Sequence, residues 1–266
     1  MSHTLTGTFR VHKAFSSRYV SESRNIIVYL PPGYNENLAR YPVFYMHDGQ
    51  NLFDASTAFL GNEWGVDEVA EALIAEGAIE PVIIVGIYNT EMKRLAEYTP
   101  VRNQRGAGGQ ARQYGRLIVE ELKPFIDNEY RTLPDRSNTA LGGSSLGGLA
   151  SLYLGLRHSS TFGKLAVMSP SVWWANRAIL REVNRLGKKP ETKIWLDIGT
   201  CEGDNPQACV RNVRDLRDAL LSKGWRLGRD LRFVEDEGAG HDEKAWGFRM
   251  RDVLTFLFPP GGANLG

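Results

Sequence analysis

A five-residue motif near the middle of the chain is typical of enzymes that use a serine nucleophile. Residues 143–147, GSSLG, read G-x-S-x-G, and they separate a short apolar run ending at Leu141 from a helix-periodic segment that begins at about Leu146. In such a nucleophile elbow the strand turns so sharply into the helix that the serine backbone is strained and the flanking glycines must lack side chains. The motif predicts that Ser145 Oγ lies at a helix N-terminus, where developing negative charge is stabilised.

The same glycine-rich turn could instead hold a phosphate group or be a turn without a function. A phosphate-binding P-loop needs Lys followed by Ser or Thr after its second glycine. Here Gly148 is followed by Leu149 and Ala150. Because a predicted strand precedes the motif and a predicted helix follows it, we interpret it as a nucleophile elbow.

A serine hydroxyl is a poor nucleophile without a base, so a histidine is required. In proteins with a nucleophile elbow this histidine follows both the serine and the acid in the chain. His241 lies in a Gly-rich turn after the last apolar run and before the last helical segment. His47 also ends an apolar run but precedes the serine, and His158 ends a helical segment, where it is suited to capping the helix. The order of the chain therefore predicts His241 as the base.

The remaining catalytic groups are expected on loops that follow other apolar runs. A carboxylate that orients the histidine should follow the run at 192–200, and both Glu202 and Asp204 qualify by position. An oxyanion hole needs two backbone amides, one of them from Leu146, the residue after the serine. The second should come from the loop after the run at 41–49, where Gln50 is the best candidate.

The order of apolar and helix-periodic segments predicts an α/β fold that can position these loops. Residues 7–15 and 24–31 alternate polar and apolar side chains, which is typical of an antiparallel hairpin. Short apolar runs then alternate with amphipathic stretches, and such βαβ units give a mostly parallel sheet with helices on both faces. The runs are 41–49, 81–87, 138–144, 163–169, 192–200 and 229–236, and the helical stretches are 64–77, 113–130, 146–158, 205–224 and 243–258. We expect one domain over residues 1–258, a flexible tail over 259–266, and a long loop over the site at 89–112.

Composition excludes several other classes of protein. Lys and Arg total 32 and Asp and Glu total 31, and this balance gives no support to a nucleic-acid binder. Two cysteines cannot form a disulfide framework or a four-cysteine zinc site, although Cys201 and Cys209 could be reduced or form one bridge. No apolar stretch approaches the length of a membrane span and no signal peptide is visible, so we expect a cytoplasmic protein without a membrane partner. The oligomeric state does not follow from the sequence.

Several longer segments resemble the esterase D-like branch of the α/β-hydrolase superfamily, which includes S-formylglutathione hydrolases, feruloyl and acetyl xylan esterases, enterobactin esterases and mycolyltransferases. The resemblance covers nearly the whole chain and is carried by residues 41–54, 94–100, 142–153, 162–174, 197–203 and 240–246. It implies a three-layer α/β-hydrolase sandwich without a large lid. It also implies Glu202 rather than Asp204 as the acid, because mycolyltransferases have a glutamate shortly after a Gly-Thr pair, and it supports Gln50, which follows an Asp-Gly pair.

The resemblance further implies a serine carboxylic ester hydrolase that forms an acyl-enzyme on a small-molecule ester and needs no metal or cofactor. We expect Trp173 and Trp174 to line an acyl or aromatic-group pocket, and Asp48 and Arg94 to take part in substrate binding. The net charge of +3 over the 89–112 loop suggests a siderophore trilactone as a second type of substrate. Two further candidate functions are an acyltransferase acting on a sugar hydroxyl and a non-catalytic binding module on the same fold.

Overall fold

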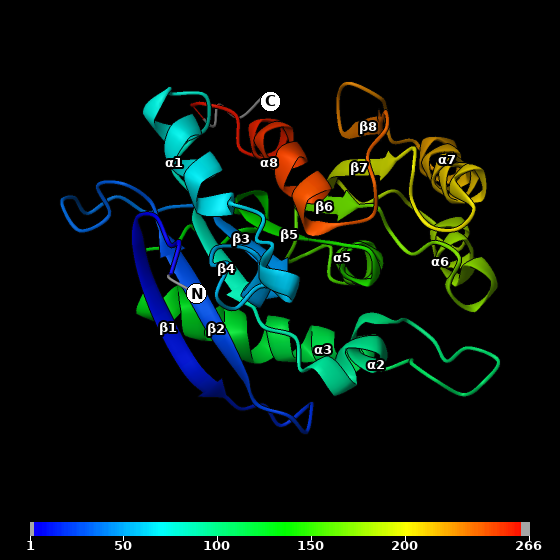
Figure 1. Ribbon diagram of the computed structural model, residues 1–266, viewed down its shortest axis with the longest axis horizontal. Helices are drawn as coiled ribbons and strands as arrows, with labels where there is room; N and C mark the ends of the chain where they lie inside the picture. Colours follow the sequence, from blue (N-terminus) through cyan, green and yellow to red (C-terminus); the bar gives the residue numbers. More distant parts are fainter. Residues whose placement is uncertain (1–2, 262–266) are drawn as a thin grey trace.

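The computed structural model describes residues 3–261, and at its centre is an eight-stranded sheet (Figure 1). The strands are β1 (Thr8–Phe15), β2 (Arg24–Leu30), β3 (Val43–His47), β4 (Ile83–Ile87), β5 (Thr139–Ser144), β6 (Lys164–Met168), β7 (Lys193–Gly199) and β8 (Leu231–Asp236). Their order in the sheet is β1-β2-β4-β3-β5-β6-β7-β8. β2 pairs antiparallel with both β1 and β4, and the other neighbours pair parallel. The predicted N-terminal hairpin and mostly parallel sheet are therefore confirmed.

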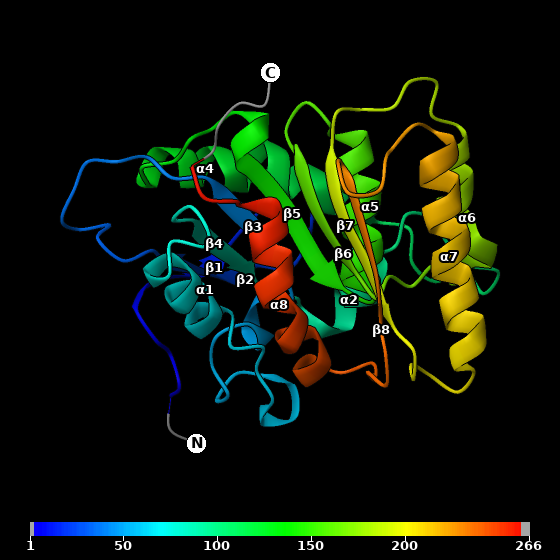
Figure 2. The same cartoon turned by 90° about the horizontal axis from the view of Figure 1, so that it is seen from above.

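Helices cover both faces of the sheet because successive side chains of a strand point to opposite sides. In β3, Val43 and Tyr45 pack into one apolar core, which we call the first core. Phe44 and Met46 pack into a second core on the opposite face of the sheet. Helices α1 (Val66–Ala75) and α8 (Glu243–Leu257) cover the second core and lie beside one another in front of the sheet (Figure 2). The first core is covered by the remaining longer helices, which include α5 (Leu146–Arg157), α6 (Trp174–Asn184) and α7 (Pro206–Ser222). This arrangement is the expected three-layer sandwich.

The predicted helix at 113–130 is a continuous but irregular helical rod. It comprises α3 (Ala111–Arg116), a π-helical segment η4 (Leu117–Leu122) and α4 (Lys123–Glu129). Pro124 lies in the first turn of α4. Because proline has no amide hydrogen, the regular pattern of helical hydrogen bonds is interrupted there.

Two helices were not predicted from the sequence. The loop expected at 89–112 contains α2 (Arg94–Tyr98), which is too short for its apolar spacing to be recognised. The other is α6, whose first turn contains three consecutive residues with positive φ, at 175–177. Its regular helical periodicity therefore begins only at Ala178.

No helix in the described part of the chain is long and apolar enough to cross a membrane. Residues 262–266 of the expected C-terminal tail lie outside the described residues.

A buried ion pair joins the sheet to α2. Arg24, on β2, donates through both terminal guanidinium nitrogens to the Glu97 carboxylate, over 2.8 and 2.9 Å. Both side chains are almost fully removed from solvent. The Arg24 guanidinium also faces the ring of Tyr114 on α3. Losing either member would leave an uncompensated buried charge, so the pair fixes the position of α2.

We predict that Arg24→Met lowers the free energy of unfolding by about 3 to 5 kcal/mol, because it leaves Glu97 buried without its partner. The midpoint of urea unfolding measures the loss. Arg116→Met is the matched control, since Arg116 pairs with Glu120 at an exposed helical position and should shift the midpoint little. Equal shifts for the two variants would contradict this role of the buried pair.

Candidate active site

The serine of the G-x-S-x-G motif lies on a strained turn between β5 and α5. Ser145 has φ 57° and ψ −121°, a conformation that is costly for a residue with a side chain. Its amide donates to the carbonyl of Met168 at the end of β6, over 3.0 Å. A Cβ atom on Gly148 would lie 2.6 Å from the same carbonyl oxygen, so glycine at this position lets the turn pack directly against β6.

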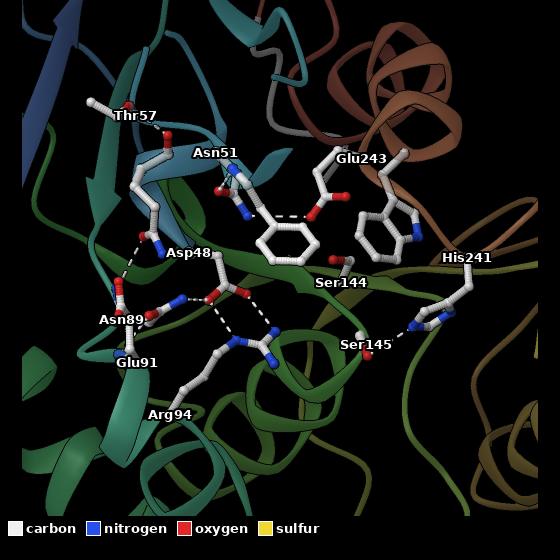
Figure 3. Close-up of a pocket in the computed structure, with 13 residues that line it drawn as sticks. Asp48, Asn51, Thr57, Asn89, Glu91, Arg94, Ser144, Ser145, His241 and Glu243 are labelled. Atoms are coloured by element: carbon white, nitrogen blue, oxygen red, sulfur yellow. Dashed lines mark hydrogen bonds and ion pairs between the residues drawn. The ribbon is translucent and has the colours of Figure 1, made fainter. Parts of the chain in front are cut away.

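Three residues from distant parts of the chain form a chain of hydrogen bonds at the carboxyl ends of the strands. Ser145 Oγ lies 2.9 Å from His241 Nε2, and His241 Nδ1 lies 2.6 Å from Glu202 Oε2. Figure 3 shows Ser145 and His241 facing one another at one side of a pocket. Of the two candidate acids, Glu202 is buried against the histidine, whereas Asp204 is exposed.

The hydrogen bonds of Glu202 determine which histidine nitrogen carries the proton. An ionised carboxylate only accepts hydrogen bonds, so His241 Nδ1 must donate to it. In a neutral imidazole the other nitrogen, Nε2, is then an acceptor that faces the Ser145 hydroxyl. Ser145 Oγ therefore lies within hydrogen-bond distance of the imidazole nitrogen that does not face Glu202.

A second group of buried polar groups forms hydrogen bonds with the Glu202 oxygen that does not contact His241. Glu202 Oε1 accepts hydrogen bonds from the Gly199 amide at 2.7 Å and from Ser169 Oγ at 2.5 Å. Ser169 Oγ in turn accepts from Trp246 Nε1 and from an Arg249 guanidinium nitrogen, both on α8. Another nitrogen of Arg249 lies 2.5 Å from Asp197 Oδ1. Each oxygen of the buried Glu202 carboxylate therefore has a donor, which offsets the cost of burying the charge.

Sequence reasoning missed this supporting group. Asp197 lies within β7, and its carboxylate accepts hydrogen bonds from Arg249, Trp195 and the Ser169 amide. The sequence did contain one indication of this group. In the last helix, the charged residue Arg249 occupies a position that the spacing of the apolar residues assigns to the buried face. A buried arginine requires a buried acceptor.

Glycine also allows the loops that carry Glu202 and His241 to touch. A Cβ atom on Gly199, at the end of β7, would lie 2.4 Å from the Ala239 carbonyl oxygen in the loop before His241. The Cys201 amide donates to that same carbonyl over 3.0 Å. Any side chain at position 199 would push the histidine loop away from Glu202. Nearby, Cys201 and Cys209 both have free thiols.

The two amides predicted for an oxyanion hole both lie at the start of helical turns. Leu146 is the first residue of α5, and Gln50 lies in the 3-10 turn η1 (Gly49–Asn51) directly after β3. Amides in the first turn of an α-helix have no acceptor within the helix, which leaves that of Leu146 available to a ligand. The Gln50 side chain is fixed separately, because its Oε1 accepts from the Asn89 amide.

A cavity of about 680 Å³ opens beside Ser145 and His241 (Figure 3). Most of the residues that line it are polar, and they include three acidic residues and one arginine. The lining comprises Asp48, Gln50, Asn51, Thr57, Phe59, Asn89, Glu91, Arg94, Ser144, Ser145, His241, Glu243 and Trp246. Burial raises the pKa of Glu243, which lies in the first turn of α8.

Asp48 and Arg94, both expected in substrate binding, form an ion pair in this lining. Arg94 Nε and Nη2 each lie 2.8 Å from an Asp48 carboxylate oxygen, and Asn89 donates to the same carboxylate. Burial alone would raise the pKa of Asp48, but Arg94 and Asn89 outweigh it and hold that pKa below its ordinary value. Asp48 is therefore an ionised anchor for Arg94.

The two tryptophans predicted to line a pocket have different surroundings. Trp174 is buried, and its Nε1 donates to the Val101 carbonyl over 2.8 Å, so it anchors the loop that precedes α3. Trp173 is 57% exposed and packs edge-on against the Trp174 ring. Neither residue lines the cavity of 680 Å³.

His47 ends β3 close to the site but is fully buried. Its Nδ1 lies 2.8 Å from the Tyr114 hydroxyl, and its other ring nitrogen has no hydrogen-bond partner among the described residues. Burial lowers the pKa of His47 to about 4, an effect that the neighbouring Asp48 carboxylate only partly opposes. The ring is neutral at pH 7 and packs against Tyr98 and Tyr114 as a core residue.

This depressed pKa predicts a loss of stability in mild acid. In the unfolded chain the histidine takes up a proton near pH 6.5, whereas in the folded protein it does so only near pH 4. The free energy of unfolding should therefore fall by about 1.4 kcal/mol per pH unit between these values. Between pH 7 and pH 4.5, the free energy of unfolding of the unchanged protein, measured with urea, should fall by about 2 to 3 kcal/mol more than that of the His47→Phe variant. Parallel pH profiles for the two proteins would contradict the assignment.

Comparisons with known proteins agree with this architecture. The chain is 26% identical over 272 residues to the uncharacterized protein YbbA of Bacillus subtilis, covering 98% of this chain and all of YbbA. It is 28% identical over 257 residues to the ferri-bacillibactin esterase BesA of the same organism, covering 85% of this chain and 82% of BesA. A crystal structure of the BES protein from Bacillus cereus has the same fold, with a TM-score of 0.75 and 24% identity over 97% of both chains.

The match to a family model extends over most of the chain. The model is described as "Putative esterase" and aligns with residues 17–257. The chain therefore belongs to this esterase family and is a carboxylesterase-type hydrolase of the α/β-hydrolase fold.

Proposed function

We propose that the protein hydrolyses carboxylic esters through an acyl-enzyme on Ser145, with His241 as general base and Glu202 as the acid that orients it. The observation that carries the proposal is the continuous hydrogen-bonded chain from Ser145 Oγ through the imidazole to a buried carboxylate. Asp204, the alternative acid, is exposed and is not part of this proposal.

In the first half of the reaction, Ser145 Oγ bonds to the ester carbonyl carbon while its proton passes to His241 Nε2. The imidazolium that forms is stabilised by Glu202, which accepts from Nδ1. The carbonyl oxygen becomes an oxyanion, for which the Leu146 and Gln50 amides are the proposed donors. When the carbon–oxygen bond to the alcohol breaks, His241 returns the proton to the departing alcohol oxygen.

In the second half, water takes the place of the alcohol. The water oxygen attacks the acyl carbon while His241 accepts a proton from the water. The bond between the acyl carbon and Ser145 Oγ then breaks. The proton on His241 returns to the serine, and a carboxylic acid leaves. An acyltransferase would follow the same steps with a sugar hydroxyl in place of water, and its products would shift when an acceptor alcohol is added.

Substitutions of the three residues test the mechanism. Ser145→Ala should lower kcat for p-nitrophenyl acetate by about 10⁵-fold or more and abolish labelling by a fluorophosphonate probe. Glu202→Gln should lower kcat by about 10³ to 10⁴-fold, because the amide no longer orients the histidine as an ionised carboxylate does. Asp204→Asn is the matched control for Glu202 and should keep most of the activity. The mechanism is wrong if Ser145→Ala still turns over the ester at a comparable rate.

The charges around the larger cavity favour an ester of a neutral, polar alcohol. Three carboxyl groups line it, on Asp48, Glu91 and Glu243, and the only guanidinium in the lining belongs to Arg94. The other basic residues of the 89–112 loop, which gave that segment its positive charge, are absent from this lining. A siderophore trilactone is a second candidate, because BesA is an esterase of a ferric siderophore, but its ferric form is anionic and would meet like charges here.

A comparison of two substrates decides between these candidates. We predict that kcat/KM for an acetylated neutral sugar exceeds that for a ferric catecholate trilactone by at least about tenfold, because like charges disfavour the anionic substrate. Replacing both Glu91 and Glu243 by Gln should raise the trilactone rate relative to that of the sugar ester. Preference of the unchanged protein for the trilactone would favour the siderophore function instead.

A further inference from the structure

A second, smaller cavity lies beside His241, close to Ser145. Its volume is about 140 Å³, and it is lined by Ser169, Pro170, Ser171, Val172, Trp173, Ile198, Glu202, Gly203, Cys209, Asn212 and His241. Among the residues that the structure describes, His241 alone lines both cavities. Ser171 Oγ lies 3.4 Å from Ser145 Oγ, so this cavity begins one side chain away from the serine.

The surface of the small cavity is mainly apolar. Val172 and Ile198, which are at most 2% exposed, contribute to it, as does Cys209 from α7. Trp173, the most exposed of the large apolar side chains that line it, lies at the mouth. Its ring is held edge-on against Trp174, which is itself anchored to the Val101 carbonyl. The size of this cavity is therefore set by packed side chains.

The order of events at Ser145 indicates which half of an ester each cavity holds. The acyl group stays attached to the serine while the alcohol departs, and water must then reach the acyl carbon from the place that the alcohol left. The larger cavity is lined mostly by polar and charged residues and has room for an alcohol and for the water that replaces it. The smaller cavity offers an apolar wall for a group that remains in place.

We propose that the small cavity is the acyl subsite and that it restricts the enzyme to short, unbranched acyl groups of about two to four carbons. This inference rests on the proposed function, because it assumes the acyl-enzyme on Ser145. A volume of 140 Å³ corresponds to about four or five groups of the size of a water molecule. Trp173 and Cys209 are the residues that limit the length of the chain.

The test uses p-nitrophenyl esters that share one alcohol and differ in acyl length, from acetate through butyrate to octanoate. For the unchanged protein, kcat/KM should fall by at least about tenfold between butyrate and octanoate, because a hydrophobic pocket discriminates about tenfold or more for each methylene that it cannot hold. Trp173→Ala removes the side chain at the mouth of the cavity and should raise the ratio of kcat/KM for octanoate to kcat/KM for butyrate. Cys209→Met reduces the volume of the cavity and should lower the ratio of kcat/KM for butyrate to kcat/KM for acetate.

Phe59→Ala is the matched control, because Phe59 is a 62% exposed aromatic residue that lines only the larger of the two cavities. It should leave the acyl-length ratios unchanged. The inference is overturned if these ratios change with Phe59→Ala but not with the Trp173 and Cys209 variants, since the acyl group would then occupy the larger cavity. Fluorophosphonate labelling of Ser145 in each variant shows whether the nucleophile is intact, and it thereby separates failure of the acyl subsite from failure of the proposed mechanism.

Discussion

The burial of one carboxylate, that of Glu202, determines how the loops around the site are arranged. A buried charge is tolerated only when hydrogen bonds replace those it made with water. Glu202 obtains them from the end of β7, from Ser169 after β6 and from His241 after β8. Three neighbouring strand ends are thus held together around a single side chain, and α8 supplies the next layer of donors through Trp246 and Arg249.

The sequence predicted the elements whose signals are local. The elbow around Ser145 has a fixed spacing, and the strands are apolar runs bounded by turn residues, so both could be recognised without knowledge of the tertiary structure. The position of His241 followed from the order of the chain. Asp204 and Glu202 are two residues apart and both qualify by position. The family resemblance favoured Glu202, and in the structure Glu202 is buried whereas Asp204 is exposed.

What the sequence could not show depends on contacts between distant segments. The link from Asp197 through Arg249 to Ser169 joins residues up to 80 positions apart, and no spacing rule relates them. The helix α6 was missed because three residues with positive φ interrupt its first turn. The surroundings of the basic residues in the 89–112 loop could not be predicted either, because Arg94 is paired with Asp48 and the other basic residues of the loop lie outside the lining of the larger cavity.

The dependence of the site on α8 has a consequence for synthesis of the protein on the ribosome. His241 precedes this helix, and Trp246 and Arg249 lie within it, so the histidine and its supporting donors are translated well after Ser145. Ser145 pairs with a residue 96 positions later in the chain. A nascent chain therefore contains β5 and the elbow before it contains His241, and the hydrogen bond between Ser145 and His241 can form only after the segment that leads into α8 has left the exit tunnel.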